Sequence, residues 1–549
     1  MRALAPPGSG VSLQLVAGTY VVLLGMSVDA SMVDGLLGFC VERIDHTEAD
    51  VRTLQNPLLF ERNDRGRRAD HSSARNPIQS FVWGDYAAKP EHTYTYTVTA
   101  MYGTPARPVR GAAARAQVTT ESPDDGAHGV FFNRGVAASA AYEARFGSRR
   151  PDRVPNREAY AWLSRGLEEA LLAFIGQAAD NRFGLRAAMY EFEYPRVLGA
   201  FRIAADAGAD VRIVVDGVRG RTTGRDNEAA IAAAGIGHLT VPRTRISIAH
   251  NKFIVLLRDG VAVEVWTGST NITEGGIFGH ANVGHRVRDR VIAERYLAYW
   301  RKLATDPERK AFRTFNDAAP SFRRTRPRRG VTPTVFSPRS ALDSLAWYVR
   351  IADSAQQAVF LTAAFGLTSE IAPVFAGERP YLRYLLLDTV KGQIEAARRE
   401  PGNVLSAGGF EGRGAYRTWI ARALRHLNRL DYVHTKLMLV DPLTSDPVVV
   451  TGSANWSDES SRTNDENMLV IRGDQRTADI YLTDFMRLFN HYRLRGKART
   501  PDGELEPAPG MREGNRASVH LAPDDSWARP FYVSGSPEEK ERLLFSMAG

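Results

Sequence analysis

The chain has 549 residues, of which 44% are hydrophobic and 24% are charged, a composition typical of a globular protein with about two to four domains. The formal net charge of +9 favours anionic partners, and it does not choose between nucleic acid, anionic lipid headgroups and phosphoesters. The single cysteine, Cys40, excludes an internal disulfide framework and is compatible with a reducing cytoplasm, where we place the protein while leaving secretion open. No run of about 18 apolar residues occurs, so we predict no membrane-spanning helix.

Residues 1–122 show the pattern of an all-β sandwich, in which short β-rich runs alternate with Gly, Pro and Asp turns. The clearest strand is His92–Met101, where Tyr94, Tyr96 and Val98 alternate with threonines at the period of a half-buried strand. The other predicted strands are Val11–Val16, Tyr20–Leu24, Phe39–Ile44 and Ala112–Thr120. The Tyr-x-Tyr-x-Val strand, together with Trp83 upstream, resembles a fibronectin type III module.

From residue 123 onward, helical patterns alternate with buried strands, and this order occurs twice. For residues 123–325 we predict helices at Glu158–Ala179, Pro195–Ala207 and Val291–Leu303, and strands at Leu185–Phe192, Val211–Val215, Phe253–Leu257 and Val261–Trp266. For residues 326–500 we predict helices at Ser340–Ile351 and Ile480–Tyr492, an amphipathic stretch at Ala415–Leu430, and strands at Ala358–Ala364, Leu382–Leu387, Leu437–Val440, Pro447–Val450 and Met468–Ile471. The repeated order predicts two tandem homologous α/β units that arose by internal duplication.

An arginine-rich linker, FRRTRPRRG within Ala318–Thr332, joins the two units. We interpret it as a solvated connection, with a contact to substrate phosphates as the alternative. Residues 501–549 are rich in Pro, Gly and charge, which indicates an irregular C-terminal tail that packs on the second unit.

A short motif occurs twice at one internal spacing. His250-Asn251-Lys252 is followed by Gly268-Ser269-Thr270-Asn271, and His434-Thr435-Lys436 is followed by Gly452-Ser453-Ala454-Asn455. From His to Asn there are 21 positions in each copy, and the copies lie 184 residues apart. A lone His-x-Lys is weak evidence because short patterns recur by chance. Two copies, each with Gly-Ser-x-Asn at the same distance, indicate a duplicated chemical site.

These residue types suit the cleavage of a phosphodiester. The reaction needs a nucleophile, an acid for the leaving oxygen and positive charge near the phosphate oxygens. Histidine serves both proton-transfer roles because its pKa lies near 6.5. On a strand, residues i and i+2 point to the same face, so each His and its Lys are expected to project together.

The constellation resembles the phospholipase D superfamily, the HKD phosphodiesterases, over residues 130–500. The resemblance implies two α-β-α units whose motifs meet at a pseudo-twofold interface. It also implies a metal-independent reaction without cofactor, in which one His forms a phosphohistidine and the other protonates the leaving alcohol. The expected catalytic residues are His250, Lys252, Asn271, His434, Lys436, Asn455 and Glu466, supported by Ser269, Asn282, Asp441 and Ser453.

The two copies differ at positions where the family carries acidic residues. Five residues after the Lys, the second copy has Asp441 and the first has Leu257. Eleven residues after the Asn, the second copy has Glu466 and the first has Asn282. We expect Glu466 to orient His434 and Asn282 to orient His250, each within its own copy. A carboxylate partner raises the pKa of a histidine more than an amide does. This pairing predicts that His434 is the general acid and His250 the nucleophile.

We therefore predict a monomeric phosphodiesterase with one active site between the two units. The two-copy arrangement resembles phospholipases and transphosphatidylases, which favours a phospholipid substrate, with transfer to water or to an alcohol. One alternative is a nuclease of the same superfamily acting on DNA or RNA, in agreement with the basic charge and the arginine linker. A second is a catalytically silent phosphate-binding protein. We predict no metal site, although His280 and His285 in GHANVGH are conceivable ligands.

Overall fold

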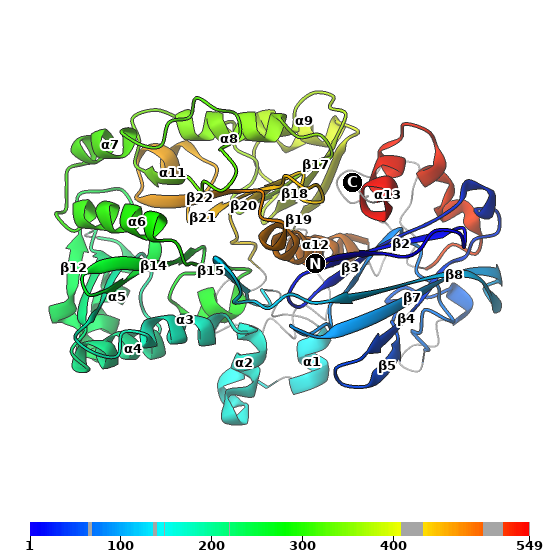
Figure 1. The fold of residues 1–549 in the computed structure, drawn as a ribbon, viewed down its shortest axis with the longest axis horizontal. Helices are drawn as coiled ribbons and strands as arrows, with labels where there is room; N and C mark the ends of the chain where they lie inside the picture. Colours follow the sequence, from blue (N-terminus) through cyan, green and yellow to red (C-terminus); the bar gives the residue numbers. More distant parts are fainter. Residues whose placement is uncertain are drawn as a thin grey trace.

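The computed structural model describes residues 1–63, 69–135, 140–147, 149–218, 220–407, 432–497 and 520–547. The predicted amphipathic stretch Ala415–Leu430 and residues 501–519 of the predicted tail lie outside the described residues. Figure 1 shows the N-terminal β-sheets in blue at the right, the first α/β unit in cyan and green at the lower left, and the second unit in yellow and orange above it.

The N-terminal part consists of two four-stranded sheets that share one core. Their strands are β1 (Arg2–Leu4), β2 (Val11–Ala17), β3 (Val22–Val28), β4 (Gly38–Asp45), β5 (Asp50–Thr53), β6 (Val82–Asp85), β7 (Thr93–Thr104) and β8 (Arg107–Thr119). One sheet has the order β1-β2-β3-β6 and the other β5-β4-β7-β8, and all pairs are antiparallel. Tyr94, Tyr96 and Val98 of β7 point into the core, as their alternation predicts. The resemblance to a fibronectin type III module stays a prediction.

The first α/β unit is built on a seven-stranded sheet of order β12-β11-β10-β13-β14-β15-β9. Its strands are β9 (His128–Phe132), β10 (Phe183–Met189), β11 (Asp210–Asp216), β12 (Thr240–Arg243), β13 (Lys252–Arg258), β14 (Val261–Gly268) and β15 (Val283–Val287). Its helices are α1 (Ala140–Phe146), α2 (Glu158–Ser164), α3 (Leu167–Gly176), α4 (Pro195–Asp206), α5 (Thr222–Ala234), α6 (Arg290–Leu303) and α7 (Arg309–Asp317). The β13–β14 hairpin turns at Asp259 and Gly260, which have φ of 50° and 78° and so fit the tight turn that this dipeptide predicts.

The second unit repeats this sheet, with order β19-β18-β17-β20-β21-β22-β16. Its strands are β16 (Thr334–Ser337), β17 (Ala358–Ala363), β18 (Leu382–Leu387), β19 (Asn403–Ala407), β20 (Leu437–Val440), β21 (Val448–Gly452) and β22 (Glu466–Arg472). Its helices are α8 (Asp343–Asp353), α9 (Ile394–Arg399), α11 (Asp458–Arg462) and α12 (Gln475–Lys497). Strand for strand, the two sheets have the same order and the same mixture of parallel and antiparallel pairs. The internal repeat that the sequence predicts is therefore present.

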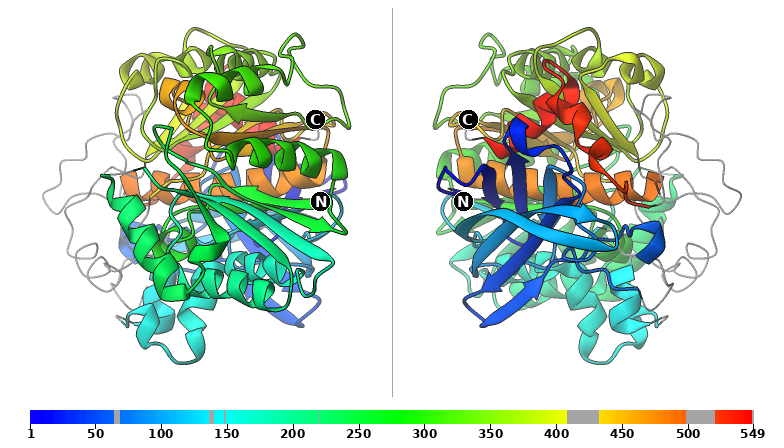
Figure 2. Two further views of the ribbon diagram at one scale, coloured as in Figure 1. Left: turned by 90° about the vertical axis from the view of Figure 1, so that its left-hand side faces the viewer. Right: turned by 90° about the vertical axis from the view of Figure 1, so that its right-hand side faces the viewer.

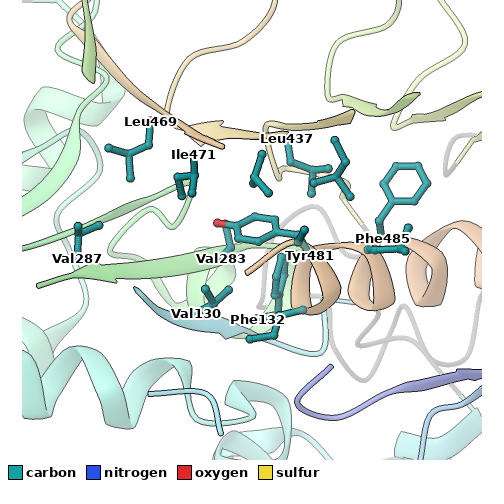
Figure 3. Close-up of a cluster of buried hydrophobic side chains, with 14 of the residues drawn as sticks. Val130, Phe132, Val283, Val287, Leu437, Leu469, Ile471, Tyr481 and Phe485 are labelled. Carbon is teal, nitrogen blue, oxygen red and sulfur yellow. The ribbon is translucent and has the colours of Figure 1, made fainter. Parts of the chain in front are cut away.

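The two sheets face each other across a shared hydrophobic core that also contains α6 and α12. Figure 3 shows the part of this core where Val283 and Leu469, from the two sheets, lie near Tyr481 of α12. Alternation along the strands explains how each sheet covers two cores. In β13, Phe253, Val255 and Leu257 face this shared core, whereas Ile254 and Leu256 face the helices on the outer side. Figure 2 shows from two sides that α12 runs between the second unit and the N-terminal sheets.

One predicted helix is in fact two. The periodic stretch Glu158–Ala179 is interrupted at Arg165 and Gly166, whose φ values of 55° and 93° are left-handed. An α-helix cannot continue through such residues, so α2 ends at Ser164 and α3 begins at Leu167. The apolar spacing is preserved because both helices bury their faces in the same core.

The tail does not pack on the second unit alone. Its described part contains α13 (Pro537–Ser546), which contacts β2, β3 and β6 of the N-terminal sheets as well as β18. A Cβ on Gly25 of β3 would lie 1.7 Å from the carbonyl oxygen of Phe545, so only glycine permits this approach. The prediction is corrected because the tail fills the junction between the sandwich and the second unit.

The arginine linker forms ion pairs with the second unit, of which the one with Asp441 is largely buried. Arg326 donates to Asp441 and to the carbonyl of Ser354, and Arg329 pairs with Asp446. These contacts tie the linker to the second unit. Within the part of the chain that the structure describes, no helix is both long and apolar enough to cross a membrane.

Candidate active site

The two motifs lie on segments that lead into equivalent strands. Lys252 is the first residue of β13, and Lys436 immediately precedes β20, so each His lies in the extended segment before its strand. Two short parallel bridges join the units here, Ile248 with Asn464 and Ala281 with Val433. Each His-bearing segment therefore runs beside the segment of the other unit that carries Glu466 or Asn282.

His250 is held by the second unit. Its Nδ1 lies 2.9 Å from Oε2 of Glu466, and both side chains are buried. The same carboxylate oxygen accepts a hydrogen bond of 2.6 Å from Oγ of Ser453. The carboxylate therefore fixes a proton on Nδ1 of His250 and leaves Nε2 for chemistry.

His434 is held by the first unit. Its Nδ1 lies 2.9 Å from Oδ1 of Asn282, which also accepts a hydrogen bond of 2.8 Å from Oγ of Ser269. Nδ2 of Asn282 donates to the carbonyl of Gly276, so the amide is oriented with its oxygen toward the ring. No described residue bonds Nε2 of either histidine.

This arrangement corrects the predicted pairing. We expected Glu466 beside His434 and Asn282 beside His250, and the structure has each partner on the opposite histidine. The reason is the interface: the units exchange partners across their approximate twofold relation, and sequence spacing within one copy does not reveal this. The argument that gave His434 the better-held proton is wrong for the same reason.

The two lysines are buried beside their histidines. Nζ of Lys252 donates to the carbonyl of His250 at 2.5 Å, and Nζ of Lys436 donates to that of His434 at 2.6 Å. Burial lowers the pKa of Lys252 to about 8. Burial, and then the charge of Lys252, lower the pKa of Lys436 well below its usual range. Two buried cations that repel each other form a site that favours an anion between them.

Burial disfavours the charged form of both histidines. Burial lowers the pKa of His250 to about 4, although the neighbouring Glu466 opposes the shift. The pKa of His434 is lowered well below its usual range by burial, then by Lys436 and His280. A carboxylate thus favours the cation of His250, and no carboxylate partner does so for His434 among the described residues.

The two asparagines of the motif, Asn271 and Asn455, have different hydrogen-bond partners. Nδ2 of Asn271 donates to Glu191 at 2.5 Å, and Oδ1 of both Asn271 and Asn455 is buried without a hydrogen-bond partner among the described residues. Such unpartnered polar atoms at the motif suggest groups that a ligand would satisfy.

Asp441 does not reach the site. It follows β20, has φ of 50°, and accepts hydrogen bonds from the backbone amides of Gln356 and Gln357 in addition to the pair with Arg326. Its counterpart Leu257 is buried in the core shared by the two sheets. These contacts stabilise the fold at the end of β20 away from His434, and the supporting role of Asp441 in the site stays a prediction.

Several residues beside the histidines lie outside the repeated motif and were not predicted as site residues. The ring of Tyr190 lies 4.9 Å from that of His250, and Nζ of Lys252 lies 5.2 Å from the same tyrosine. Tyr432 and His280 lie 5.1 and 5.9 Å from the ring of His434. Tyr190 follows the last residue of β10, and polar residues at the ends of strands are the signal that would have identified it.

His280 and His285 do not form a metal centre. His285 is buried between His128, whose Nδ1 lies 2.9 Å from it, and the hydroxyl of Tyr481. Over the described ranges, one group of His, Cys, Asp or Glu side chains is close enough to hold a metal ion, namely Asp45, Glu48 and His92 in the N-terminal sheets. In that group Asp45 already accepts from His92, and Glu48 pairs with Lys89.

Comparison with protein families gives a match to one segment of each repeated unit. The family described as cardiolipin synthase, PLD-like domain, matches residues 171–304 and 410–489, and each segment contains one copy of the motif. These two segments are similar to a phospholipase D-like domain. The matched segments include β13 to β15 and β20 to β22, the strands that carry or flank the site.

Individual relatives match over shorter stretches. Mitochondrial cardiolipin hydrolase of Xenopus tropicalis is 39% identical over 70 residues, which is 13% of this chain and 31% of that protein. The dog enzyme of the same name is 32% identical over 69 residues, 13% of this chain and 25% of its own length. The chain thus spans about a third or less of the curated relatives that it matches.

Solved structures give broader and weaker likenesses. Phosphatidylserine synthase from Haemophilus influenzae matches at 11% identity over 60% of this chain and 85% of its own, with a TM-score of 0.41. Nuc from Salmonella typhimurium, a phospholipase D family member, matches at 29% identity over 25% of this chain and 87% of its own, with a TM-score of 0.22.

Proposed function

We propose that the protein is a phosphodiesterase that cleaves its substrate through a phosphohistidine, with one active site between the two phospholipase D-like units. The observation that carries the proposal is the exchanged pairing of Nδ1 of His250 and His434 with Glu466 and Asn282. It orients both rings, and two buried lysines accompany them. A phosphodiester bound there supplies negative charge that balances the positive charge of the two lysines.

In the first step, Nε2 of His250 attacks phosphorus and the bond to the leaving alcohol breaks. Nε2 of His434 donates a proton to that alcohol oxygen. His434 takes up this proton before the step, because the negative charge of the bound phosphate favours the protonated ring. In the second step, neutral His434 takes a proton from water or from an acceptor alcohol, whose oxygen attacks phosphorus and releases His250. Both steps need no further reactant.

The two histidines take different roles because their Nδ1 partners differ. Attack through Nε2 leaves the ring of the nucleophile positively charged, with its proton still on Nδ1. Glu466 lies 2.9 Å from that proton-bearing atom of His250, whereas His434 has only an amide oxygen there. A developing cation is stabilised by a preorganised carboxylate, so His250 is the better nucleophile and His434 the acid.

We propose a phospholipid as the substrate. Glu191 and Asp216 lie close enough to Lys252 to oppose the lowering of its pKa, so the site combines cations with carboxylates. A single phosphodiester fits this mixture better than the polyanionic backbone of nucleic acid, which favours uniformly basic surfaces. The partial matches to cardiolipin hydrolases make cardiolipin the first lipid to test.

The test is a substrate panel with a matched pair of variants. Bis(p-nitrophenyl) phosphate, cardiolipin vesicles, phosphatidylcholine vesicles and single-stranded DNA are each offered to the wild type, His250→Asn and His238→Asn. His238 is an exposed histidine outside the site, so its replacement should leave rates unchanged. We expect the wild type and His238→Asn to cleave bis(p-nitrophenyl) phosphate and lipid, and His250→Asn to cleave neither. Salt-sensitive cleavage of DNA without cleavage of lipid would instead indicate a nuclease.

A further inference from the structure

A cavity whose lining includes neither His250 nor His434 lies where the N-terminal sheets meet the first unit. It has a volume of about 550 Å³ and is lined by residues from the sandwich, from the segment after β9, and from α1 and α2. Four of its lining side chains are cationic: Lys89, Arg134, Arg145 and Arg165. No carboxylate is among the described residues that line it.

Two of these arginines are built into aromatic surroundings. The guanidinium of Arg134 lies 3.9 Å from the ring centre of Trp162, and its Nε donates to the carbonyl of the same residue at 2.7 Å. Arg165 lies 4.5 Å from the ring centre of Tyr20. Stacking of this kind holds a guanidinium plane in place. It leaves the terminal nitrogens of Arg134 for a ligand, whereas Nη2 of Arg165 already donates to Asp484.

Positive charge exceeds negative charge at this junction. Arg165 and Arg487 both bind Asp484, so one carboxylate serves two arginines. Arg134 has no ion-pair partner among the residues described. Burial, followed by the charges of Arg165 and Arg487, lowers the pKa of Arg134 to about 9. A bound anion would relieve this repulsion.

The cavity is connected to the active site through one residue. Asn133, next to Arg134, accepts a hydrogen bond of 3.0 Å from the backbone N–H of Asn282. Its own Nδ2 donates to the carbonyls of Ile277 and His280. Asn282 in turn holds His434. A shift of Arg134 would therefore act on the segment that orients the proposed general acid.

We propose that this cavity binds a small phosphorylated anion, which Arg134 and Arg165 hold, and that occupancy changes turnover through Asn133 and Asn282. Guanidinium groups bind phosphate oxygens through paired hydrogen bonds, which fits a cavity lined by arginines together with alanine and aromatic side chains. The binding half of the proposal is independent of the reaction, whereas the effect on turnover rests on the proposed function.

The binding test uses inorganic pyrophosphate as the probe and the full-length protein at constant ionic strength. Because Trp162 lies against Arg134, its fluorescence should report occupancy, and Trp162→Phe should remove that part of the signal. Calorimetry should show binding in the wild type that weakens at least about tenfold in Arg134→Gln, because the variant loses hydrogen bonds from a charged group to the probe.

Three controls separate the alternatives. Arg153→Gln alters an exposed arginine outside the cavity and should bind pyrophosphate as the wild type does. His250→Asn should also retain the binding, which separates this cavity from the catalytic one. If Arg134→Gln does not fold, the exposed Arg145→Gln should still weaken binding measurably. Unchanged affinity in both cavity variants would overturn the site.

The effect on turnover is measured on bis(p-nitrophenyl) phosphate with sub-saturating substrate. We expect pyrophosphate to change the rate of the wild type in a saturable way that Arg134→Gln abolishes, beyond any competition at the active site seen in both proteins. Binding with no Arg134-dependent change in rate would overturn the coupling. A wild type that binds pyrophosphate but cleaves no diester would contradict the proposed function and leave the binding result standing.

Discussion

The two α/β units have one strand order, yet they support their histidines differently. The second unit contributes Glu466 and Asp441, and the first contributes Asn282 and Leu257 at the corresponding positions. Because the units exchange partners, the carboxylate of the second unit serves the histidine of the first. The difference between the copies therefore does not make one half-site strong and the other weak. It gives a single site two unequal histidines.

The exchange also explains why one half would not work alone. In each half, Ser and its own unit's Asn or Glu form a bonded pair, Ser269 with Asn282 and Ser453 with Glu466. Each pair then reaches across the interface to the other histidine. A change in one unit should consequently be felt by the other unit's histidine, and the following variants use this property.

The largest effect is expected from the histidines themselves. His250→Ala and His434→Ala should each lower turnover of a lipid diester by about 10²–10⁴-fold, the usual contribution of a general acid or base. In the His434→Ala variant, His250 should still attack a substrate whose leaving group is p-nitrophenol, because this leaving group barely needs a proton. Mass spectrometry of the quenched variant should find phosphate on the peptide containing His250. An adduct on His434 in His250→Ala would reverse the two roles.

Glu466→Gln should weaken the nucleophile across the interface. It removes the carboxylate that stabilises the charged ring of His250, so the rate should fall about 10–100-fold, in line with about 1.5–3 kcal/mol for a hydrogen bond to a charged group. The pKa of His250 should fall further and that of His434 should change less. Nitrogen-resolved NMR of the two rings measures both. A larger change at His434 would contradict the exchanged pairing.

The exchanged pairing could not be predicted from the sequence, although much of the site could. The motif residues, the Asp259-Gly260 turn and the strands β13 and β20 follow from local patterns. The contacts of His250 with Glu466 and of His434 with Asn282 join residues more than a hundred positions apart, and no local pattern encodes them. The same holds for α13 against β3. The break at Arg165 was hidden because the apolar spacing of α2 continues into α3.

Asn282→Asp should make the two histidines more alike. A carboxylate placed beside His434 favours its cation, so the pKa of His434 should rise. If His434 must donate a proton, activity is lost as pH rises through its pKa, and the alkaline limb of the pH–rate profile should move to higher pH. Asn282→Ser, which cannot supply the charge, is the matched control. An alkaline limb that moves down or stays in place would argue against His434 as the acid.

The smallest effect on turnover is expected from Asp441, although the family pattern places it in the motif. Its carboxylate accepts hydrogen bonds from the backbone amides of Gln356 and Gln357 and pairs with Arg326. These contacts lie at the end of β20 away from His434. Asp441→Asn keeps the size of the side chain but removes the charge, so it should lower the free energy of unfolding by about 1–3 kcal/mol, the cost of a poorly satisfied buried group. Activity should stay within about twofold, because RT ln 2 is only about 0.4 kcal/mol and no site atom changes. Denaturant unfolding and steady-state kinetics on the same preparation measure the two effects. A drop in turnover with unchanged stability would return Asp441 to the active site and would make the first unit, with Leu257 at this position, the deficient half.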